Sequence, residues 1–174
     1  MLGTIVGDIV GSIYEFDNHR SKDFPFFGEG ADFTDDSVLT LAVADALLGG
    51  KPPRETIHRW AVRHPGRGYG GGFAAWLETR DLAPYNSFGN GSAMRVSPAA
   101  LLANTLDEAL EAARRVTEVT HDHPEGIKGA LATAHAIFLA RFDAGPGEIR
   151  RVVEQRYGYD LDRTVDSIRP TYRF

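Results

Sequence analysis

Thr34-Asp35-Asp36-Ser37 leads directly into the apolar run Val38-Leu39-Thr40-Leu41-Ala42-Val43-Ala44-Asp45-Ala46-Leu47-Leu48, and this stretch defines the centre of the predicted fold. The run is richer in Ala and Leu than a typical strand, and it ends at Gly49-Gly50, a common helix terminus. We therefore predict a buried helix whose first turn is residues 34–37. Successive helical residues point about 100° apart, so Asp35 and Asp36 cannot both face solvent or both enter the core.

Two roles fit this turn, and the sequence leaves both open. Thr34 can cap the helix while the two aspartates favour the positive end of the helix dipole, an arrangement worth about 1 kcal/mol. Alternatively, the side-chain oxygens of Thr34, Asp35 and Asp36 coordinate Mg²⁺ or a similar hard cation, which prefers oxygen ligands and retains waters. Three consecutive ligands would need a complementary set elsewhere in the chain.

The composition predicts one domain with a hydrophobic core and restricts the kinds of molecule that we expect as partners. The chain has 174 residues, 43% of them hydrophobic, and a formal net charge of −5. Because nucleic acids and anionic membranes require a basic face, we expect neither as a partner, and no stretch resembles a membrane span. The chain has no cysteine, which excludes disulfides, thiolate zinc sites and a cysteine nucleophile. This suits the reducing cytoplasm, where we expect the protein to be located.

Small and apolar residues recur every four positions near the N-terminus. The small residues are Gly3, Gly7 and Gly11, and the apolar ones are Ile5, Ile9 and Ile13. This spacing predicts a helix over residues 2–15, with a strand followed by a turn as the alternative. Glycine costs about 1 kcal/mol in a helix, so the stripe indicates close backbone packing or the approach of a ligand. Asp8 and Glu15 would share one helical face.

The rest of the sequence also shows helical periodicity, and the predicted helices are joined by irregular loops. We predict helices over residues 53–63, 105–119, 124–142 and 148–157, the second opened by a capping box at Thr105 and Glu108. We predict loops over residues 16–33 and 64–73 and no clear period in the tail, 160–174. His135 is expected to be a surface histidine. No segment alternates like a strand, so the fold class is all-α.

Two glycine-rich segments and a pair of histidines could bind an anion. In residues 64–73, five glycines allow backbone N–H groups to converge on an anion, although a flexible linker fits as well. Residues 86–95 could present a phosphate site at a helix N-terminus, with the hydroxyl of Ser92 as a further donor. Of His121 and His123, we expect one to bind a ligand or the backbone and the other to be structural, while a zinc pair would lack a third soft ligand.

Four motifs occur in the order Gly7-Asp8-x-x-Gly11-x-x-x-Glu15, Phe33-Thr34-Asp35-Asp36-Ser37, Gly89-Asn90-Gly91-Ser92-Ala93-Met94-Arg95 and Thr120-His121-Asp122-His123-Pro124. In this order they resemble the ADP-ribosylglycohydrolase family, also called the dinitrogenase reductase-activating glycohydrolase family, over residues 3 to about 170. The resemblance implies a single-domain orthogonal helical bundle around a two-metal site that holds Mg²⁺ or Mn²⁺. It also implies removal of ADP-ribose from a modified protein side chain or a small acceptor.

The resemblance also assigns roles to individual residues. The metal ligands would be Thr34, Asp35 and Asp36, and Glu15 would close over the metals or assist the water. The diphosphate would be held by Gly89, Asn90, Gly91 and Ser92, with His121 approaching from across the cleft. Tyr69, Gly70 and Gly71 would line the ribose or the pyrophosphate. The family supplies further ligands from a C-terminal Gly-Gly-Asp-Thr-Asp motif, and the tail residues Asp160, Asp162 and Asp166 do not form it. We therefore expect residues 1–174 to be either a fragment or a C-terminally shortened family member, in both cases a domain that lacks this metal motif.

The leading hypothesis is a metal-dependent hydrolase that cleaves an N- or O-glycosidic bond to ADP-ribose. Asp36 or Glu15 would be the catalytic carboxylate that takes a proton as water attacks the anomeric carbon. Two alternatives remain: a module that binds ADP-ribose without cleaving it, and another metal-dependent phosphoester hydrolase.

Overall fold

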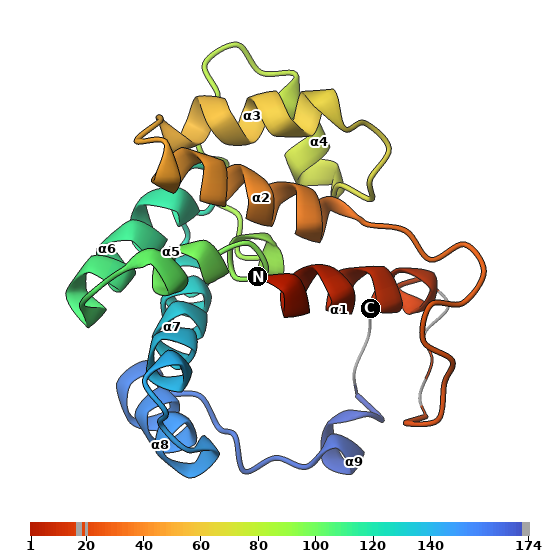
Figure 1. Ribbon diagram of the computed structural model, residues 1–174, viewed down its shortest axis with the longest axis vertical. Helices are drawn as coiled ribbons and strands as arrows, with labels where there is room; N and C mark the ends of the chain where they lie inside the picture. The colour runs from red at the N-terminus through yellow and green to blue at the C-terminus, as the bar shows by residue number, and fades with distance from the viewer. Residues whose placement is uncertain (17–18, 20, 172–174) are drawn as a thin grey trace.

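The computed structural model describes residues 1–16, 19 and 21–171, and all regular structure in these ranges is helical (Figure 1). The α-helices are α1 Leu2–Gly11, α2 Asp35–Leu48, α3 Pro53–Arg63, α4 Gly71–Leu77, α5 Ser97–Leu102, α6 Leu106–Thr117, α7 Pro124–Arg141, α8 Pro146–Tyr157 and α9 Val165–Ile168. Two short 3₁₀ helices are η1 Ser12–Tyr14 and η2 Asn90–Ser92. The prediction of an all-α fold is confirmed. Within the described ranges, no helix has both the length and the apolar character required to cross a bilayer.

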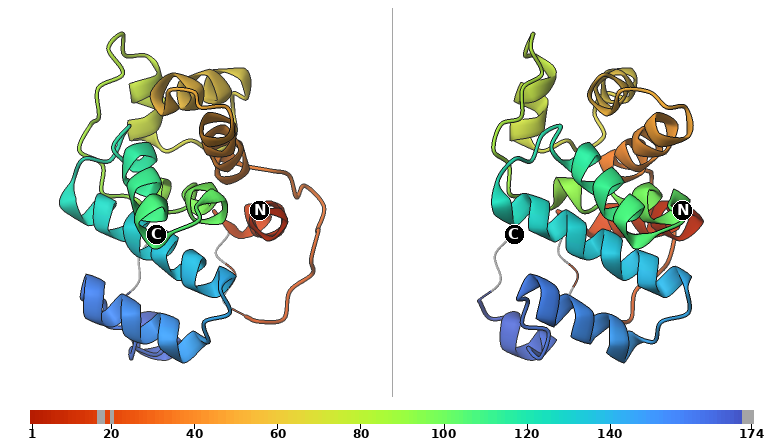
Figure 2. Two further views of the ribbon diagram at one scale, coloured as in Figure 1. Left: turned by 60° about the vertical axis from the view of Figure 1, so that its left-hand side comes forward. Right: turned by 90° about the vertical axis from the view of Figure 1, so that its left-hand side faces the viewer.

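The core lies where α2 meets α3, α5 and α6, with α7 closing it from below (Figures 1 and 2). Helix α7 runs across the direction of α1 and α2 in Figure 1, as in an orthogonal bundle. Much of the core is small: Ala42, Ala100, Ala113 and Ala134 are all fully buried. Alanines at these positions let the helix axes approach one another closely. The large anchor is Trp76 of α4, which is 2% exposed.

Helix α2 forms where the sequence predicts it, and its N-terminus is capped. The Thr34 hydroxyl accepts from the Asp36 N–H at 3.4 Å, so the capping role of Thr34 is confirmed. The run from Ser37 to Thr40 is buried, and the helix ends at Gly49, followed by Gly50 at a φ of +58°. Positive φ is readily adopted by glycine, which explains the sharp stop.

Helix α1 is attached to α2 by a carboxylate rather than by buried apolar area, because none of its residues is buried. The Asp8 carboxylate accepts three hydrogen bonds: from the Thr34 N–H at 2.9 Å, from the Thr34 hydroxyl at 2.5 Å and from the Ser37 N–H at 3.1 Å. These backbone donors belong to the first turn of α2, which has no intrahelical acceptor for them. Asp8 therefore acts as a second cap, supplied from another helix.

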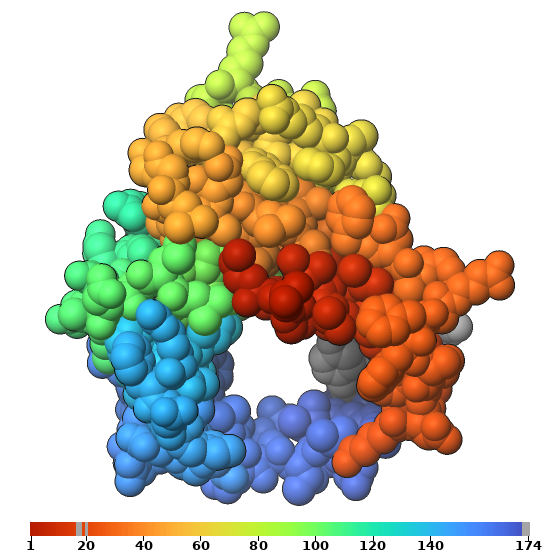
Figure 3. Space-filling model, in the orientation of Figure 1, coloured from red at the N-terminus to blue at the C-terminus, as the bar shows by residue number. Residues whose placement is uncertain are grey.

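The glycine stripe of α1 (Gly3, Gly7 and Gly11) faces open space. A Cβ atom built on any of the three glycines would meet no atom within 4 Å, so close backbone packing is excluded as the reason for the stripe. Figure 3 shows α1 along the upper rim of an opening, with α7 at its left side and the segment that follows α8, including α9, at its lower side. The approach of a ligand is the explanation that remains from the sequence.

The predicted N-terminal helix is confirmed, with a 3₁₀ last turn, whereas the predictions for residues 71–73 and for His135 were wrong. Residues 71–73 begin α4 instead of remaining irregular, because burial of Phe73 and Trp76 outweighs a cost of about 1 kcal/mol for each helical glycine. The N-terminal α-helix ends at Gly11 and continues as η1, and the tail contains α9. His135 is 4% exposed instead of lying on the surface, and its Nδ1 meets the Tyr157 hydroxyl at 3.1 Å between α7 and α8.

We predict that Asp8→Ala lowers the free energy of unfolding by about 1–3 kcal/mol, because it leaves donors at the start of α2 without an acceptor. Urea denaturation at pH 5 measures this with little interference from the neighbouring acids. Asp107→Ala is the matched control, since Asp107 is an exposed acid in the first turn of α6 and should cost about 0.5 kcal/mol or less. Equal losses in the two variants would refute the role given to Asp8.

Candidate functional site

Four carboxylates gather around the first turn of α2: Asp8 and Glu15 from the N-terminal segment, and Asp35 and Asp36 from α2 itself. Burial, helped by Asp36 and Glu15, raises the pKa of Asp35 to about 7. Burial, helped by Asp8 and Glu15, raises the pKa of Asp36 to about 6. Burial and the charge of Asp8 also raise the pKa of Glu15. Acids that are half-buried and repel one another are typical of functional sites, where a cation or a proton relieves the repulsion.

Asp35 and Asp36 line two different cavities. One cavity, which we call the loop cavity, has a volume of about 220 Å³ and includes Asp35, Gly70, Gly89, Asn90, Gly91 and His121 in its wall. The other, the acidic cavity, has a volume of about 500 Å³ and is lined by the glycine stripe of α1 together with Asp8, Glu15, Thr34 and Asp36. Asn90 belongs to both walls, so the two cavities meet beside the start of α2.

The loop of residues 64–70 is held over Asp35. The Asp35 N–H donates to the carbonyl of Arg67 at 2.7 Å, and the Arg67 guanidinium lies 3.7 Å from the centre of the Phe33 ring. The same guanidinium bonds Asp32 at 2.5 Å. Gly68 has a φ of +88°, and a Cβ atom there would lie 3.6 Å from the Asp35 carboxylate. Glycine therefore lets the backbone turn back directly above the acid.

The opposite wall is formed by residues 85–92 packed against the segment between α6 and α7. The N–H groups of Tyr85 and Ser87 both approach the carbonyl of Thr120 at 3.4 Å, and a Cβ atom on Gly126 would lie 2.6 Å from the carbonyl of Ser87. This close approach requires glycine at the start of α7. The wall thereby brings Gly91 next to His121, since a Cβ atom on Gly91 would lie 3.4 Å from Cε1 of His121.

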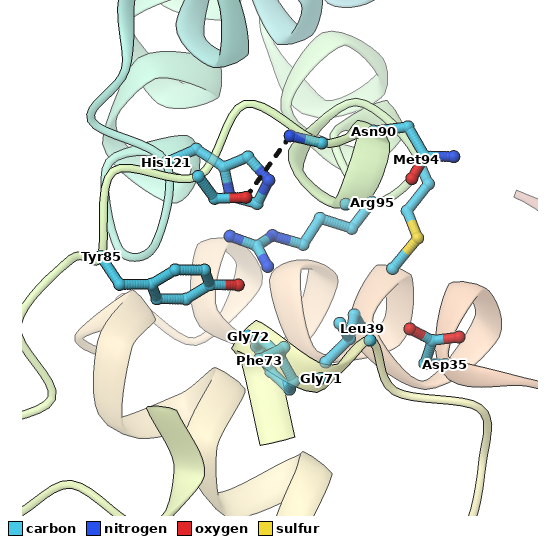
Figure 4. A pocket seen from close by; sticks show the side chains of 14 residues that line it. Asp35, Leu39, Gly71, Gly72, Phe73, Tyr85, Asn90, Met94, Arg95 and His121 are labelled. Atoms are coloured by element: carbon cyan, nitrogen blue, oxygen red, sulfur yellow. Dashed lines mark hydrogen bonds between the residues drawn. The ribbon is translucent and has the colours of Figure 1, made fainter. Parts of the chain in front are cut away.

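Arg95 is a site residue to which the sequence analysis assigned no role. Its side chain is 1% exposed, yet it lines the loop cavity, where its guanidinium lies between Tyr85 and His121 (Figure 4). Asp35 lies at the other end of the same cavity. The available signal was the position of Arg95 between a glycine-rich segment and an apolar run, where a lone charge needs a partner. Sequence reasoning likewise gave Asp8 no role, although Asp8 belongs to the first of the four quoted motifs.

Two side chains that were predicted to contact a ligand, those of Tyr69 and Ser92, do not line the loop cavity. The Tyr69 hydroxyl donates to the carbonyl of His64 at 2.9 Å, and its ring stacks on Phe73. Ser92 is 1% exposed and donates to the carbonyl of Gly126 at 3.2 Å. The geometry gives both side chains structural contacts instead. Gly89 precedes the 3₁₀ turn η2 and Gly91 lies within it, so this loop does not open directly onto the N-terminus of α5.

The two histidines of residues 121–123 make different contacts. His123 caps α7, since its Nδ1 accepts from the Glu125 N–H at 3.1 Å. His121 is buried and lines the loop cavity.

The side-chain oxygens at this site are of the type that a hard divalent cation prefers, but too few of the described ones meet at one point. Oxygen ligands are what Mg²⁺ and Mn²⁺ prefer, and Mg²⁺ is often held by one or two carboxylates together with water and substrate phosphates. Among the described residues, however, no three acidic, histidine or cysteine side chains converge on one point. The Thr34 hydroxyl also donates its proton to Asp8. Its oxygen keeps a lone pair beyond the one that accepts from the Asp36 N–H, so Asp35, Asp36 and Thr34 are the residues here that could hold such an ion.

Comparison with known proteins identifies the family. The family described as ADP-ribosylglycohydrolase matches residues 1–171 of this chain. The chain belongs to the ADP-ribosylglycohydrolase family. The all-helical architecture agrees with this family assignment.

Relatives of this ADP-ribosylglycohydrolase-family chain include ADP-ribosylhydrolase ARH3 of several vertebrates. The mouse protein (Mus musculus) is 29% identical over an alignment 205 positions long, which covers 97% of this chain and 55% of the mouse protein. The human protein (Homo sapiens) is 28% identical, with 97% and 56% covered. The zebrafish protein (Danio rerio) is 28% identical, with 80% and 46% covered. The chain thus spans about half the length of the curated relatives it matches.

We predict that Asp35→Asn stabilises the metal-free protein at pH 8. The folded-state pKa of Asp35 is raised to about 7, so ionisation disfavours the folded state at high pH. Because solvent still screens this half-buried group, we expect a gain of about 1–2 kcal/mol at pH 8. The gain should shrink as the pH falls through about 7 and vanish near the ordinary pKa of aspartate, about 4.

Urea denaturation in EDTA across this pH range measures the difference between the variant and the wild type. Asp107→Asn should show no comparable trend, since its carboxylate is exposed. A gain that is independent of pH would mean that charge repulsion at Asp35 is not its source.

Proposed function

We propose that this protein releases ADP-ribose from a modified side chain or a small acceptor by hydrolysis of the glycosidic bond. Membership of the ADP-ribosylglycohydrolase family and the names of the ARH3 relatives support this reaction class. The observation that carries the proposal is the distribution of charge around Asn90. The buried cation Arg95 lies in the loop cavity, and a group of carboxylates lies in the adjoining acidic cavity.

An ADP-ribose molecule has the complementary distribution of groups. Its diphosphate would lie in the loop cavity, where Gly70, Gly89 and Gly91 expose backbone, His121 contributes a nitrogen donor and buried Arg95 contributes positive charge. Its terminal ribose would lie next to Asp35, and the bond to be cleaved would point into the acidic cavity. Together the two cavities fall within the volume range of about 300–1,000 Å³ that is usual for small-molecule sites.

In this orientation, Asp36 or Glu15 accepts a proton from the water that attacks the anomeric carbon. A general base works best when its pKa lies near the working pH. The pKa of Asp36 is raised to about 6 in the metal-free protein, and a bound cation would lower it. The burial and the neighbouring charge that raise the pKa of Glu15 act in the same direction. Asp8 has a different task, because its oxygens are occupied by the first turn of α2.

Asp35 and Asp36 would hold Mg²⁺ or Mn²⁺, and a divalent cation bound there would supply charge to fix the ribose hydroxyls and polarise water. We further propose a cytoplasmic protein with an ADP-ribosylated protein or small molecule as its partner, and without nucleic-acid or membrane partners. The basis is the sequence: no cysteine, a net charge of −5 and no basic block.

A second candidate is a module that binds ADP-ribose without cleaving it. The observation in its favour is that the described residues do not bring three potential metal ligands together. The loop cavity alone would then account for binding.

Release of ADP-ribose from ADP-ribosylated serine and arginine peptides, with Mg²⁺ or with EDTA, tests the main proposal. We expect metal-dependent release by the wild type and a loss of at least about 100-fold in Asp36→Asn, since a general base contributes about 10²–10⁴-fold. ADP-ribose affinity, measured by calorimetry in EDTA so that no metal contributes, should be retained in that variant. Asp107→Asn serves as the control.

Two other outcomes of this experiment favour the alternatives. Binding of ADP-ribose without release from either peptide favours the binding module. Cleavage of an aryl phosphate together with inactivity on both peptides favours a different metal-dependent phosphoester hydrolase.

We predict that Mg²⁺ or Mn²⁺ raises the Tm of the wild type at pH 8 and that Asp35→Asn abolishes the rise. At a metal concentration of 100 times Kd, binding stabilises the folded state by about 2.7 kcal/mol, which corresponds to several degrees in a chain of this length. Differential scanning calorimetry with and without the metal measures the shift. An equal rise in Asp35→Asn would contradict its assignment as a ligand.

A further inference from the structure

Arg95 is a buried cation without a carboxylate partner among the described residues. One of its terminal nitrogens, Nη2, donates to the carbonyl of Val116 at 3.1 Å and to the hydroxyl of Thr120 at 2.8 Å. Val116 belongs to the last turn of α6, where the partial negative charge of a helix C-terminus stabilises a cation. The guanidinium is therefore fixed in place at the edge of the loop cavity.

The contact with Arg95 determines how the Thr120 hydroxyl can be oriented. A hydroxyl has one proton to donate and two lone pairs to accept with, and the guanidinium can only donate. The Thr120 oxygen therefore accepts from Arg95. Its second contact is Nδ1 of His121, at 2.8 Å. In the described part of the chain, Thr120 has no other side-chain hydrogen-bond partner, so its own proton is available only to that nitrogen.

This arrangement determines the tautomer of His121. If Nδ1 accepts the proton of Thr120, the neutral ring must carry its own proton on Nε2. The reverse arrangement, with Nδ1–H donating to Thr120, would leave the buried hydroxyl proton without an acceptor, which costs about 1–3 kcal/mol. The carbonyl of Gly89 is close enough to favour a proton on the ring, although Nε2 makes no hydrogen bond of good geometry with it.

The groups around the imidazole ring of His121 also favour its neutral form. Burial and the nearby charge of Arg95 lower the pKa of His121 to about 4, against smaller opposing effects from Gly89 and Asp122. Tyr85, whose ring centre lies 6.3 Å from that of His121, has a pKa raised by burial and stays uncharged. Nε2 is buried without a partner and faces Gly91 on the wall of the loop cavity.

We propose that Arg95 and Thr120 are positioning residues that fix His121 as a neutral Nε2–H donor to a phosphate oxygen in the loop cavity. The chain of contacts runs from the α6 terminus through the Arg95 guanidinium and the Thr120 hydroxyl to the imidazole, and it leaves one N–H directed at the ligand. The identity of the phosphate as part of a nucleotide sugar rests on the proposed function. The tautomer itself does not.

The first test is the ¹⁵N spectrum of the histidine rings in the free wild-type protein at pH 8. The expected pattern for His121 is a protonated Nε2 and an unprotonated Nδ1. Thr120→Ser should keep this pattern, whereas Thr120→Val should give a mixture of both tautomers. A protonated Nδ1 in the wild type, or an unchanged pattern in Thr120→Val, overturns the proposal whether or not the protein hydrolyses any substrate.

The second test uses inorganic pyrophosphate and ADP-ribose as probes in calorimetric titrations. Thr120→Val should weaken both by about fivefold, the effect of one hydrogen bond that is no longer preorganised. Thr120→Ser should bind as the wild type does. The control Thr133→Val removes a threonine hydroxyl whose one partner among residues 1–16, 19 and 21–171 is the Gly129 carbonyl within α7, and it should leave both affinities unchanged.

The outcomes separate this inference from the proposed function. Full pyrophosphate affinity in Thr120→Val overturns the positioning role. A wild type that binds pyrophosphate but not ADP-ribose leaves the inference standing and overturns the proposed function. Failure of the wild type to bind either probe overturns both the donor role and the function. If Thr120→Val does not fold, the tautomer of His121 in the wild type still tests the proposal.

Discussion

The Asp8 carboxylate at the N-terminus of α2 is the interaction on which the site depends. It satisfies donors of the first α2 turn from 26 and 29 residues away in the sequence, and thereby attaches a helix with no buried residue to the rest of the fold. The same contact places the carboxylate of Asp8 next to Asp35 and Asp36, which already repel each other. A charge arrangement of this kind costs stability in the metal-free protein, and proteins retain such costs mainly at functional sites.

The two cavities follow from this arrangement because consecutive helical residues point in different directions. Asp35 faces the loops that follow α3 and precede α5, and Asp36 faces α1. Both loops are held by backbone hydrogen bonds, one to the start of α2 and the other to the segment after α6. The site is thus built where helix termini meet. Polar backbone groups are free at those ends, while the small-residue core beneath them keeps the helices in place.

Local signals were sufficient for much of the fold. Thr34 and Thr105 are followed by residues that complete helix caps, and these caps are present as predicted. The signals failed where tertiary contacts compete with local preference. Phe73 and Trp76 make a helix out of a glycine-rich stretch, and a hydroxyl partner in α8 allows His135 to be buried. Sequence order alone could not show that Tyr69 and Ser92 have structural partners, because those partners lie in other elements or turns.

Arg95 and Asp8 show a further limit of sequence reasoning. Each is a single charge whose role depends on groups distant in the sequence: Val116 and Thr120 for Arg95, and Thr34 and Ser37 for Asp8. A crystal structure of the protein with ADP-ribose tests the central claim most directly. The diphosphate is predicted to lie beside Gly91 and His121, with the terminal ribose next to Asp35. A nucleotide bound elsewhere, such as in a separate cavity whose wall includes Thr133 of α7 and Val153 of α8, would contradict this account.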